Sequence, residues 1–177
     1  MRLKATALWM AVTAGCAVTV SYAADPAREH AMLSQARVSM NQAITVAEEQ
    51  SGGQAIDANY RFKSGTPGMY EVKVLSMDGK KLLDFTINPQ DGRALKATRR
   101  DAGKVFTRIG PADLLNAQTP LKGAIKAAEA QTGGKAVVAD TDRHADTVRY
   151  TVKVVMADGR AESIEVDGAS GKVASVK

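Results

Sequence analysis

The sequence predicts an α+β fold of two tandem modules, each consisting of a helix packed on a three-stranded antiparallel sheet. Three observations support this prediction. The chain contains an internal repeat, each copy begins with a segment of helical apolar periodicity, and each such segment is followed by stretches in which apolar and polar residues alternate. A helix with one apolar stripe and a sheet with one apolar face bury each other, so the two are expected to pack together.

The repeat is visible when the chain is aligned with itself. Residues 43–56 align with residues 124–137 at an offset of 81, with eight identities in fourteen positions. Residues 70–74 then match residues 150–154 at an offset of 80, and the last glycine of each copy matches at an offset of 79. Offsets that fall by one between blocks are what single-residue deletions in loops produce, so the copies are two versions of one module.

One helix is expected at the start of each copy. Thr119 is a good N-cap residue, and Pro120 suits the first helical position. The glycine pairs at 52–53 and 133–134 are expected to cap the helices, since glycine accepts the left-handed conformation. A further helical stretch is expected to begin at Asp25-Pro26. The apolar stripes are Met40, Ala43, Ile44 and Ala47 in the first helix and Leu121, Ala124, Ile125 and Ala128 in the second.

Three strands are expected after each helix, because apolar side chains recur at every second position there. The Asp-Gly pairs at 78–79 and 158–159 predict hairpin turns between the second and third strands. The clearest alternating runs are 56–63, 70–74 and 83–87 in the first copy and 148–154 and 164–166 in the second.

These elements predict a first module at 24–97, a linker at 98–118 and a second module at 119–177. The linker region is basic, and we interpret it as solvated, with contact to an anionic partner as the alternative. Strand edges could accept an extended peptide, unless the two sheets pair edge to edge or charges protect the edges. The bases of this region are Lys96, Arg99, Arg100, Lys104 and Arg108, with Asp101 as the only acid among them.

The first 23 residues have the pattern of a secretory signal peptide. Arg2 and Lys4 precede sixteen uncharged residues, and small residues then favour cleavage after Ala23. The uncharged run is shorter than the roughly 20 residues that a spanning helix needs. We therefore expect a periplasmic or secreted protein whose mature chain is not stably inserted in a membrane. Lipidation at Cys16 is the alternative.

The mature composition excludes several kinds of chemistry. Trp9 and Cys16 leave with the signal peptide, so disulfides, a cysteine nucleophile and thiolate zinc sites are excluded. Removal of two bases leaves 22 basic and 19 acidic side chains, a net charge of +3. That charge is mild and does not indicate a protein that binds nucleic acid.

The two histidines do not lie in a recognisable site. Neither His30 nor His144 belongs to a zinc-binding or triad motif. His144 falls in the acidic stretch 140–146, which we interpret as the solvated tip between the first two strands of the second module rather than as a cation site. We therefore expect no catalytic, metal-binding or cofactor-binding residue, and no cofactor.

The order of motifs resembles the PepSY domain, over most of residues 38–97 and 119–177. The helix carries Ala-Ile-x-x-Ala, a later strand reads Tyr-x-Val-x-Val, Asp-Gly follows, and the second copy closes with Asp-x-x-x-Gly-Lys at 167–172. The first copy departs from the closing motif, with Asn88 in place of the Asp and Pro89 after it. The resemblance implies a secreted or envelope protein without catalytic residues. The family includes a module of thermolysin-like metallopeptidase propeptides, which implies an inhibitory or regulatory role.

We therefore expect a non-catalytic, exported binding module that regulates or inhibits a peptidase or senses for an envelope partner. Its partner is expected to be another protein, either a peptidase or an envelope component. The alternative is a structural envelope protein or a carrier of small ligands or cations. A large apolar pocket between the modules would favour the carrier, whereas an exposed sheet edge would favour the protein binder. The oligomeric state stays open.

Overall fold

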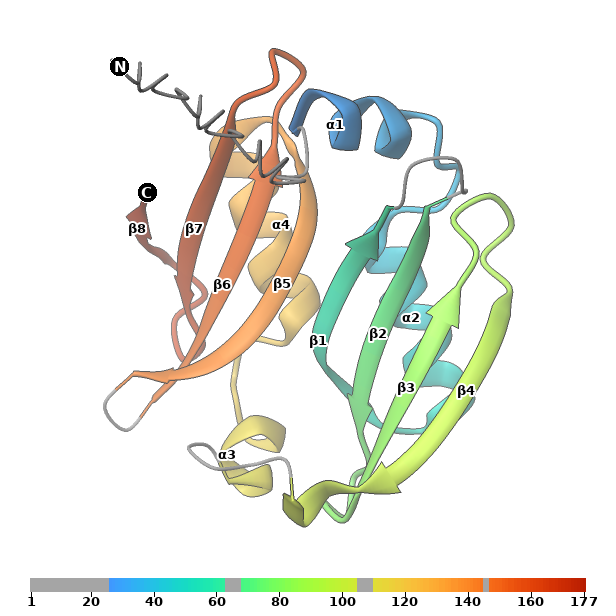
Figure 1. Cartoon of the computed structure of the whole chain (residues 1–177). Helices are drawn as coiled ribbons and strands as arrows, with labels where there is room; N and C mark the ends of the chain where they lie inside the picture. Colours follow the sequence, from blue (N-terminus) through green and yellow to red (C-terminus); the bar gives the residue numbers. More distant parts are fainter. Residues whose placement is uncertain (1–25, 63–67, 105–109, 145–146) are drawn as a thin grey trace, which may run out of the picture.

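The computed structural model describes residues 26–62, 68–104, 110–144 and 147–177 (Figure 1). The signal-peptide prediction falls on residues outside these ranges. The helices are α1 (Pro26–Ser34), α2 (Met40–Ser51), α3 (Pro111–Leu115) and α4 (Leu121–Thr132), with a 3-10 turn at Ala102–Lys104. The strands are β1 (Gln54–Arg61), β2 (Met69–Leu75), β3 (Lys81–Ile87), β4 (Ala94–Asp101), β5 (Lys135–His144), β6 (Thr147–Val155), β7 (Ala161–Asp167) and β8 (Val173–Val176).

The strands form one antiparallel sheet in the order β4-β3-β2-β1-β5-β6-β7-β8. The α+β class is therefore as predicted. The two copies of the repeat meet at a seam where β1 pairs with β5, with Ala58 opposite Ala139. Each copy supplies half of the sheet, and the two halves run outward from this seam (Figure 1). The sequence analysis left open whether the two sheets pair edge to edge, and the structure shows that they do, through β1 and β5.

The prediction of three strands per module is wrong, because each copy contributes four. Strand β4 pairs with β3, and β8 pairs with β7. The first residues of the predicted linker, 98–101, therefore belong to the sheet. Seven of the eight β4 residues are exposed, and β8 has only four residues. Neither strand has one buried face, so neither carries the alternation from which the other strands were predicted.

Helices α2 and α4 cover the same face of the sheet, one behind each half (Figure 1). Their predicted apolar stripes are buried against the strands, with Ile44 and Ile125 fully buried. At the seam, Ala58 and Ala139 are small and fully buried. The two helices meet across this part of the sheet, where Lys122 Nζ of α4 lies 2.6 Å from a carboxylate oxygen of Glu48 in α2. One continuous core thus spans both copies.

In each half of the sheet, one tyrosine donates a hydrogen bond to the chain segment that enters the helix of that half. The Tyr70 hydroxyl donates to the Val38 carbonyl at 2.7 Å, and the Tyr150 hydroxyl donates to the Thr119 carbonyl at 2.7 Å. Tyr70 and Tyr150 are 80 residues apart, and their acceptors are 81 apart, so the bonds are equivalent. Both side chains are almost fully buried, and each fixes where its helix begins.

A glutamate in each helix ties the helix to the first strand that follows it. Glu48 accepts the Ala55 amide at 3.0 Å, and Glu129 accepts the Ala136 amide at 3.0 Å. The Ala55 amide in β1 and the Ala136 amide in β5 are therefore bonded to a glutamate side chain of the preceding helix, which lies outside the strand ladder. A charged acceptor makes such a bond stronger than a neutral one.

The helix starts differ between the copies. Ser39 caps α2, accepting the Gln42 amide, while the Gln42 side chain accepts the Ser39 amide. In the second copy Pro120, rather than the predicted Thr119, is the N-cap residue, with an extended backbone, and α4 begins at Leu121. Thr119 lies one residue too early because its carbonyl is held by the tyrosine bond and its amide donates to Gly168.

The two glycines of each pair serve different purposes. Gly52 and Gly133 cap their helices with φ of 65° and 71°, as predicted. Gly53 and Gly134 are instead required by close packing. A Cβ atom on Gly53 would lie 2.4 Å from the Leu75 carbonyl oxygen, and one on Gly134 would lie 2.5 Å from a Val154 methyl group.

Alanine is expected to be more damaging at Gly53 than at Gly52. Gly52→Ala meets no atom and should cost about 1 kcal/mol through its left-handed backbone. Gly53→Ala must displace the β2 backbone, and we expect about 1–3 kcal/mol from this overpacking. Urea unfolding of the two variants measures the difference, and an equal cost would show that the Gly53 backbone and β2 are not as close as described.

The repeat extends further toward the N-terminus than the sequence alignment indicated. Leu33 of α1 and Leu114 of α3 lie 81 residues apart, and both are buried. Helix α1 begins where a helical stretch was predicted, whereas α3 was not predicted. Each short helix touches an Asp-Gly turn: Ala27 lies against Gly159, and Pro111 lies against Gly79. The short helix before each copy therefore helps to join the two halves.

Candidate binding surface

The stretch 140–146 is not the solvated tip that we predicted. Its first five residues form the end of β5, where Asp140 pairs with Thr151 and His144 pairs with Thr147 of β6. Residues 145 and 146 lie outside the described ranges. His30 lies in α1, with its Nδ1 3.4 Å from the Ser34 hydroxyl. The structure therefore places the two histidines on different elements, α1 and the end of β5. Among the described residues, no group of three or more His, Cys, Asp or Glu side chains is placed to hold a metal ion.

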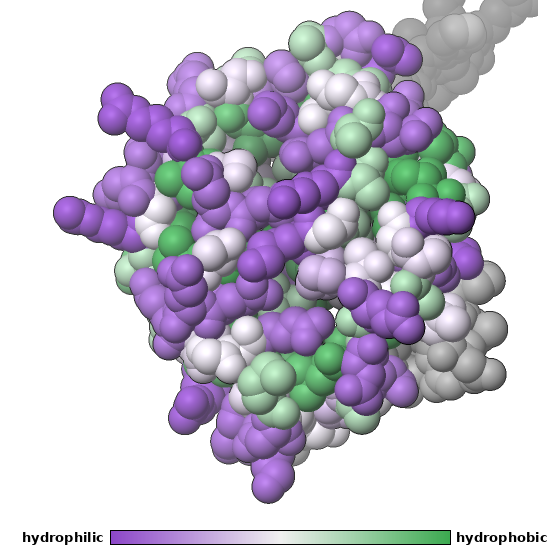
Figure 2. Space-filling view, turned by 180° about the vertical axis from the view of Figure 1, so that it is seen from behind, coloured by the Kyte–Doolittle hydropathy of each residue, from purple (hydrophilic) through white to green (hydrophobic). Residues whose placement is uncertain are grey.

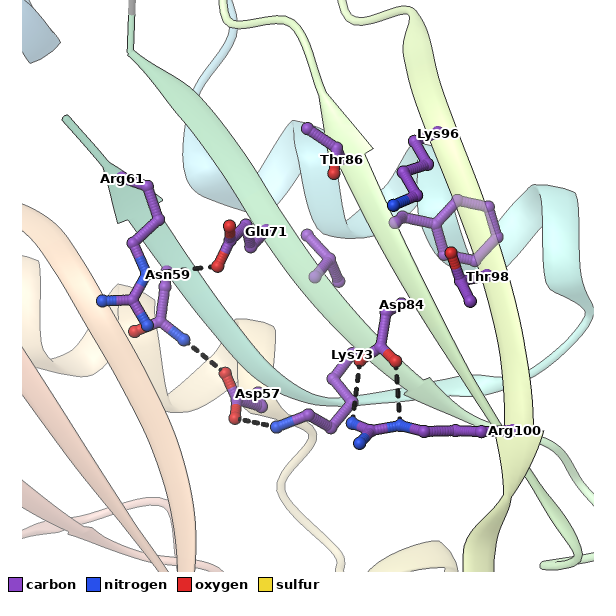
Figure 3. Close-up of a pocket in the computed structure, with 12 residues that line it drawn as sticks. Asp57, Asn59, Arg61, Glu71, Lys73, Asp84, Thr86, Lys96, Thr98 and Arg100 are labelled. Atoms are coloured by element: carbon purple, nitrogen blue, oxygen red, sulfur yellow. Dashed lines mark hydrogen bonds and ion pairs between the residues drawn. The ribbon is translucent and has the colours of Figure 1, made fainter. Parts of the chain in front are cut away.

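The face of β1–β4 that points away from α2 carries the polar side chains of the first copy (Figure 3). Here the side chains of four neighbouring strands surround a shallow hollow of about 390 Å³. The polar side chains that line it are Asp57, Asn59, Arg61, Glu71, Lys73, Asp84, Thr86, Lys96, Thr98 and Arg100. The hollow is therefore a charged, open surface rather than an apolar pocket.

Most charges in this hollow neutralise one another across neighbouring strands. Lys73 Nζ lies 2.5 Å from an Asp57 carboxylate oxygen, and Arg61 Nε lies 3.1 Å from Glu71. Asn59 also donates to Asp57, at 2.5 Å. Such cross-strand pairs stabilise a sheet and hold the side chains in place (Figure 3). The face therefore has little capacity left for a small charged ligand.

A pair of like charges crosses the seam. Asp57 of β1 lies directly opposite Asp140 of β5, although the two belong to different copies of the repeat. Loss of solvent around the Asp140 carboxyl and then the facing Asp57 carboxylate raise the pKa of Asp140. Lys73 works in the opposite direction. Sequence reasoning missed this pair because the aspartates lie 83 residues apart and meet only through the seam.

The corresponding face of the second half is partly covered. Helix α1 packs on β5 and β6, and a Glu29 carboxylate oxygen lies 3.7 Å from Lys153 Nζ. Arg149 and Lys177 both pair with Glu165, at 3.1 Å and 2.5 Å. The hydrogen bond from Lys177 is the largest of the causes that lower the pKa of Glu165 to about 2. The hollow of the first half is thus the more open of the two faces.

The outermost strands, β4 and β8, form the two edges of the sheet. Strand β4 is eight residues long, and most of its side chains are exposed. Arg100 pairs with Asp84 at 2.9 Å, but Lys96 and Arg99 have no ion-pair partner among the described residues. The other bases of the predicted basic segment are Lys104, in the 3-10 turn, and Arg108, outside the described residues.

Strand β6 is paired on both sides, with Thr151 opposite Asp140 of β5 and Glu165 of β7. Strands β4 and β8 are the two that have a neighbouring strand on one side only. On the helix side, hydrophilic side chains are spread between separate apolar patches (Figure 2). None of the described helices is long and apolar enough to cross a membrane.

A family model described as "Peptidase propeptide and YPEB domain" matches this chain twice, over residues 37–98 and 120–177. The two matches cover more than half of the chain. The protein belongs to the PepSY family. Each match begins just before one long helix and reaches the fourth strand that follows it, so the seam between β1 and β5 joins two PepSY units. The match indicates a propeptide-type domain and no catalytic family.

One solved structure of similar fold is a crystal structure from Clostridium difficile 630 described as a "putative lipoprotein". It shares 17% sequence identity with the PepSY protein, at a TM-score of 0.51, and the match covers 84% of this chain and 98% of that chain. At this identity the likeness concerns the fold alone. No curated protein matches the sequence significantly.

Proposed function

We propose that this tandem PepSY protein is exported and acts without catalysis, by binding a peptidase and restraining it. The observation that carries the proposal is the double match to a peptidase propeptide domain. The resemblance to a peptidase propeptide domain implies a role in binding a peptidase. The first 23 residues, in which two bases precede an uncharged run and small residues, support export.

The shape of the described surface supports a protein partner over a small ligand. Where β1 and β5 pair, the seam is lined by two fully buried alanines, Ala58 and Ala139. The hollow on the open face is shallow, and its charges are largely paired. By contrast, a long strand edge and the surface beside it are exposed. These are features that a partner protein can cover.

The proposal can be tested with the mature chain, residues 24–177. A tagged version is used to capture partners from a cell-envelope extract, and the captured fraction is assayed for casein hydrolysis. Addition of excess untagged chain is expected to lower the rate. A captured fraction without peptidase activity, or a rate unaffected by the chain, would contradict the proposed restraint.

Export has its own expected result. Protein recovered from the envelope fraction should begin at Ala24 and therefore contain neither Trp nor Cys. Intact-mass spectrometry measures this directly. A retained Met1 would show that the segment is not cleaved, and a lipid on Cys16 would show cleavage at the earlier site instead.

A further inference from the structure

We propose that the outer edge of β4 is the docking site for the partner, and that it takes up an extended acidic segment as an added strand. The inference rests on the proposed function and names the surface through which it would operate. It combines three features of β4: outward-pointing backbone groups, two cations that have no partner among the described residues, and a length that the opposite edge lacks.

The direction of the β4 backbone follows from its pairing with β3. The Ala102 amide donates to the Lys80 carbonyl at 2.9 Å, so these two residues occupy a hydrogen-bonded position of the ladder. Bonded and non-bonded pairs alternate along an antiparallel ladder. With Thr98 opposite Asp84 and Ala97 opposite Phe85, the backbone of Thr98 faces β3 and that of Ala97 faces outward. Arg99 likewise presents its amide and carbonyl to the outside.

The edge remains open in the structure. Among the described residues, none pairs with the outer side of β4. All its residues from Leu95 to Asp101 are exposed. A polypeptide laid along this edge could form backbone hydrogen bonds in the same register as β3 forms on the other side.

The charge of β4 selects the kind of segment that would bind. Lys96 shares a face with Arg100, while Arg99 points to the other face, so cations flank the edge above and below. Lys96 and Arg99 have no partner among the described residues, whereas Arg100 already pairs with Asp84. Acidic side chains on an added strand would satisfy both free cations.

The same charges argue against a second copy of this chain as the occupant. In an antiparallel pair of two β4 strands centred on Thr98, Lys96 of each copy would lie opposite Arg100 of the other copy. Like charges on neighbouring strands are destabilising, and exposed cations on an edge are a known protection against self-pairing. An acidic strand from another protein is compatible with the edge, and a second β4 is not.

The opposite edge provides a built-in comparison. Strand β8 has only four residues, and its terminal Lys177 pairs with Glu165. Ser163 and Lys177 exchange both backbone hydrogen bonds, at 2.9 Å each, so the neighbouring Val176 faces outward. At the repeat offset of 79, Val176 corresponds to Ala97. Proline at either position removes an outward amide and leaves the ladder with its neighbour intact.

The experiment measures binding of a fluorescent, capped peptide of four Glu-Thr repeats to the mature chain by anisotropy at low salt. Ala97→Pro is expected to weaken binding about tenfold, by removing a backbone donor and obstructing the edge. Val176→Pro is the matched control and should bind as the unchanged chain does.

The double variant K96E/R99E should also lose at least about tenfold in affinity for the peptide, whereas K126E, on the exposed face of α4, should keep its affinity. Circular dichroism and urea unfolding confirm that each variant is folded.

Several outcomes would overturn the inference. The Ala97→Pro variant could bind the Glu-Thr peptide as tightly as the unchanged chain does, or the unchanged chain could bind a Lys-Thr peptide as tightly as the Glu-Thr peptide. The unchanged chain could also show no binding at about 1 mM peptide, or form a dimer in sedimentation that Ala97→Pro abolishes. If Ala97→Pro fails to fold, the charge variants still decide the question.

Inhibition of the captured peptidase separates the two proposals. If the unchanged chain inhibits and Ala97→Pro inhibits equally, the β4 site is wrong and the proposed function stands. If the unchanged chain does not inhibit, the proposed function fails whatever the peptide shows.

Discussion

Replacing either Ile44 or Ile125 with alanine is expected to lower the free energy of unfolding by about 2–5 kcal/mol. The two side chains are fully buried at equivalent positions of α2 and α4, and each packs between its helix and the sheet. The removed carbon atoms leave a cavity that the surrounding strands cannot fill completely. Because one core spans the seam, both variants should shift the same cooperative transition rather than one of two.

Urea unfolding followed by far-ultraviolet circular dichroism measures both effects. Lys126→Ala is the matched control on the exposed face of α4 and should change stability by less than about 0.5 kcal/mol. A near-neutral effect at either isoleucine would show that its helix does not pack on the sheet. Two separated transitions in one variant would show that the halves unfold independently, against the continuous sheet.

The parts of the fold that bury one face could be predicted from the sequence. The stripe that contains Ile44 identified α2, and the equivalent stripe identified α4. The Asp-Gly turns lie where they were expected, with Gly79 and Gly159 at positive φ. In each case the same residues that carry the pattern also make the core, so pattern and packing agree.

Strand β4 could not be predicted by the same reasoning. Its sequence, Ala-Leu-Lys-Ala-Thr-Arg-Arg-Asp, has no apolar face because nothing described covers either side of it. It is held by its ladder with β3 rather than by burial. A pattern that depends on burial cannot detect a strand that is held by backbone hydrogen bonds and exposed ion pairs, and the charged residues were therefore assigned to a linker.

The pairing of β1 with β5 at the seam also could not be predicted from the sequence. Alternation in β1 and β5 shows which face is apolar, but it does not show which strand lies beside each one. The opposed pair Asp57 and Asp140 and the joint role of Ala58 and Ala139 exist only because the copies pair there. For the same reason Asp140 was placed in a solvated tip, since its acidic neighbours resemble a loop when each repeat is considered alone.

Tyr70→Phe and Tyr150→Phe are each expected to cost about 1–3 kcal/mol at neutral pH. Each hydroxyl donates a 2.7 Å bond to a backbone carbonyl at the entry to a helix, and each ring is almost fully buried. Phenylalanine keeps the ring but leaves the Val38 or Thr119 carbonyl without this donor. Equal losses in the two variants would show that the repeated bonds are energetically equivalent. No loss in either would show that water replaces the hydroxyl.

The same tyrosines predict a loss of stability in alkali. Burial raises the pKa of Tyr150 to about 12 and raises the pKa of Tyr70 further, because the charged phenolate is disfavoured in the core. A group whose pKa is raised by folding contributes its full stability below its unfolded pKa of about 10 and loses it as the pH rises through the folded value. For Tyr150 the loss approaches about 3 kcal/mol above pH 12.

Urea unfolding at pH 8 and pH 11 should show reduced stability at the higher pH, and Tyr150→Phe should show a smaller reduction. An identical pH dependence in Tyr150→Phe and the unchanged chain would mean that the Tyr150 hydroxyl is not buried as described.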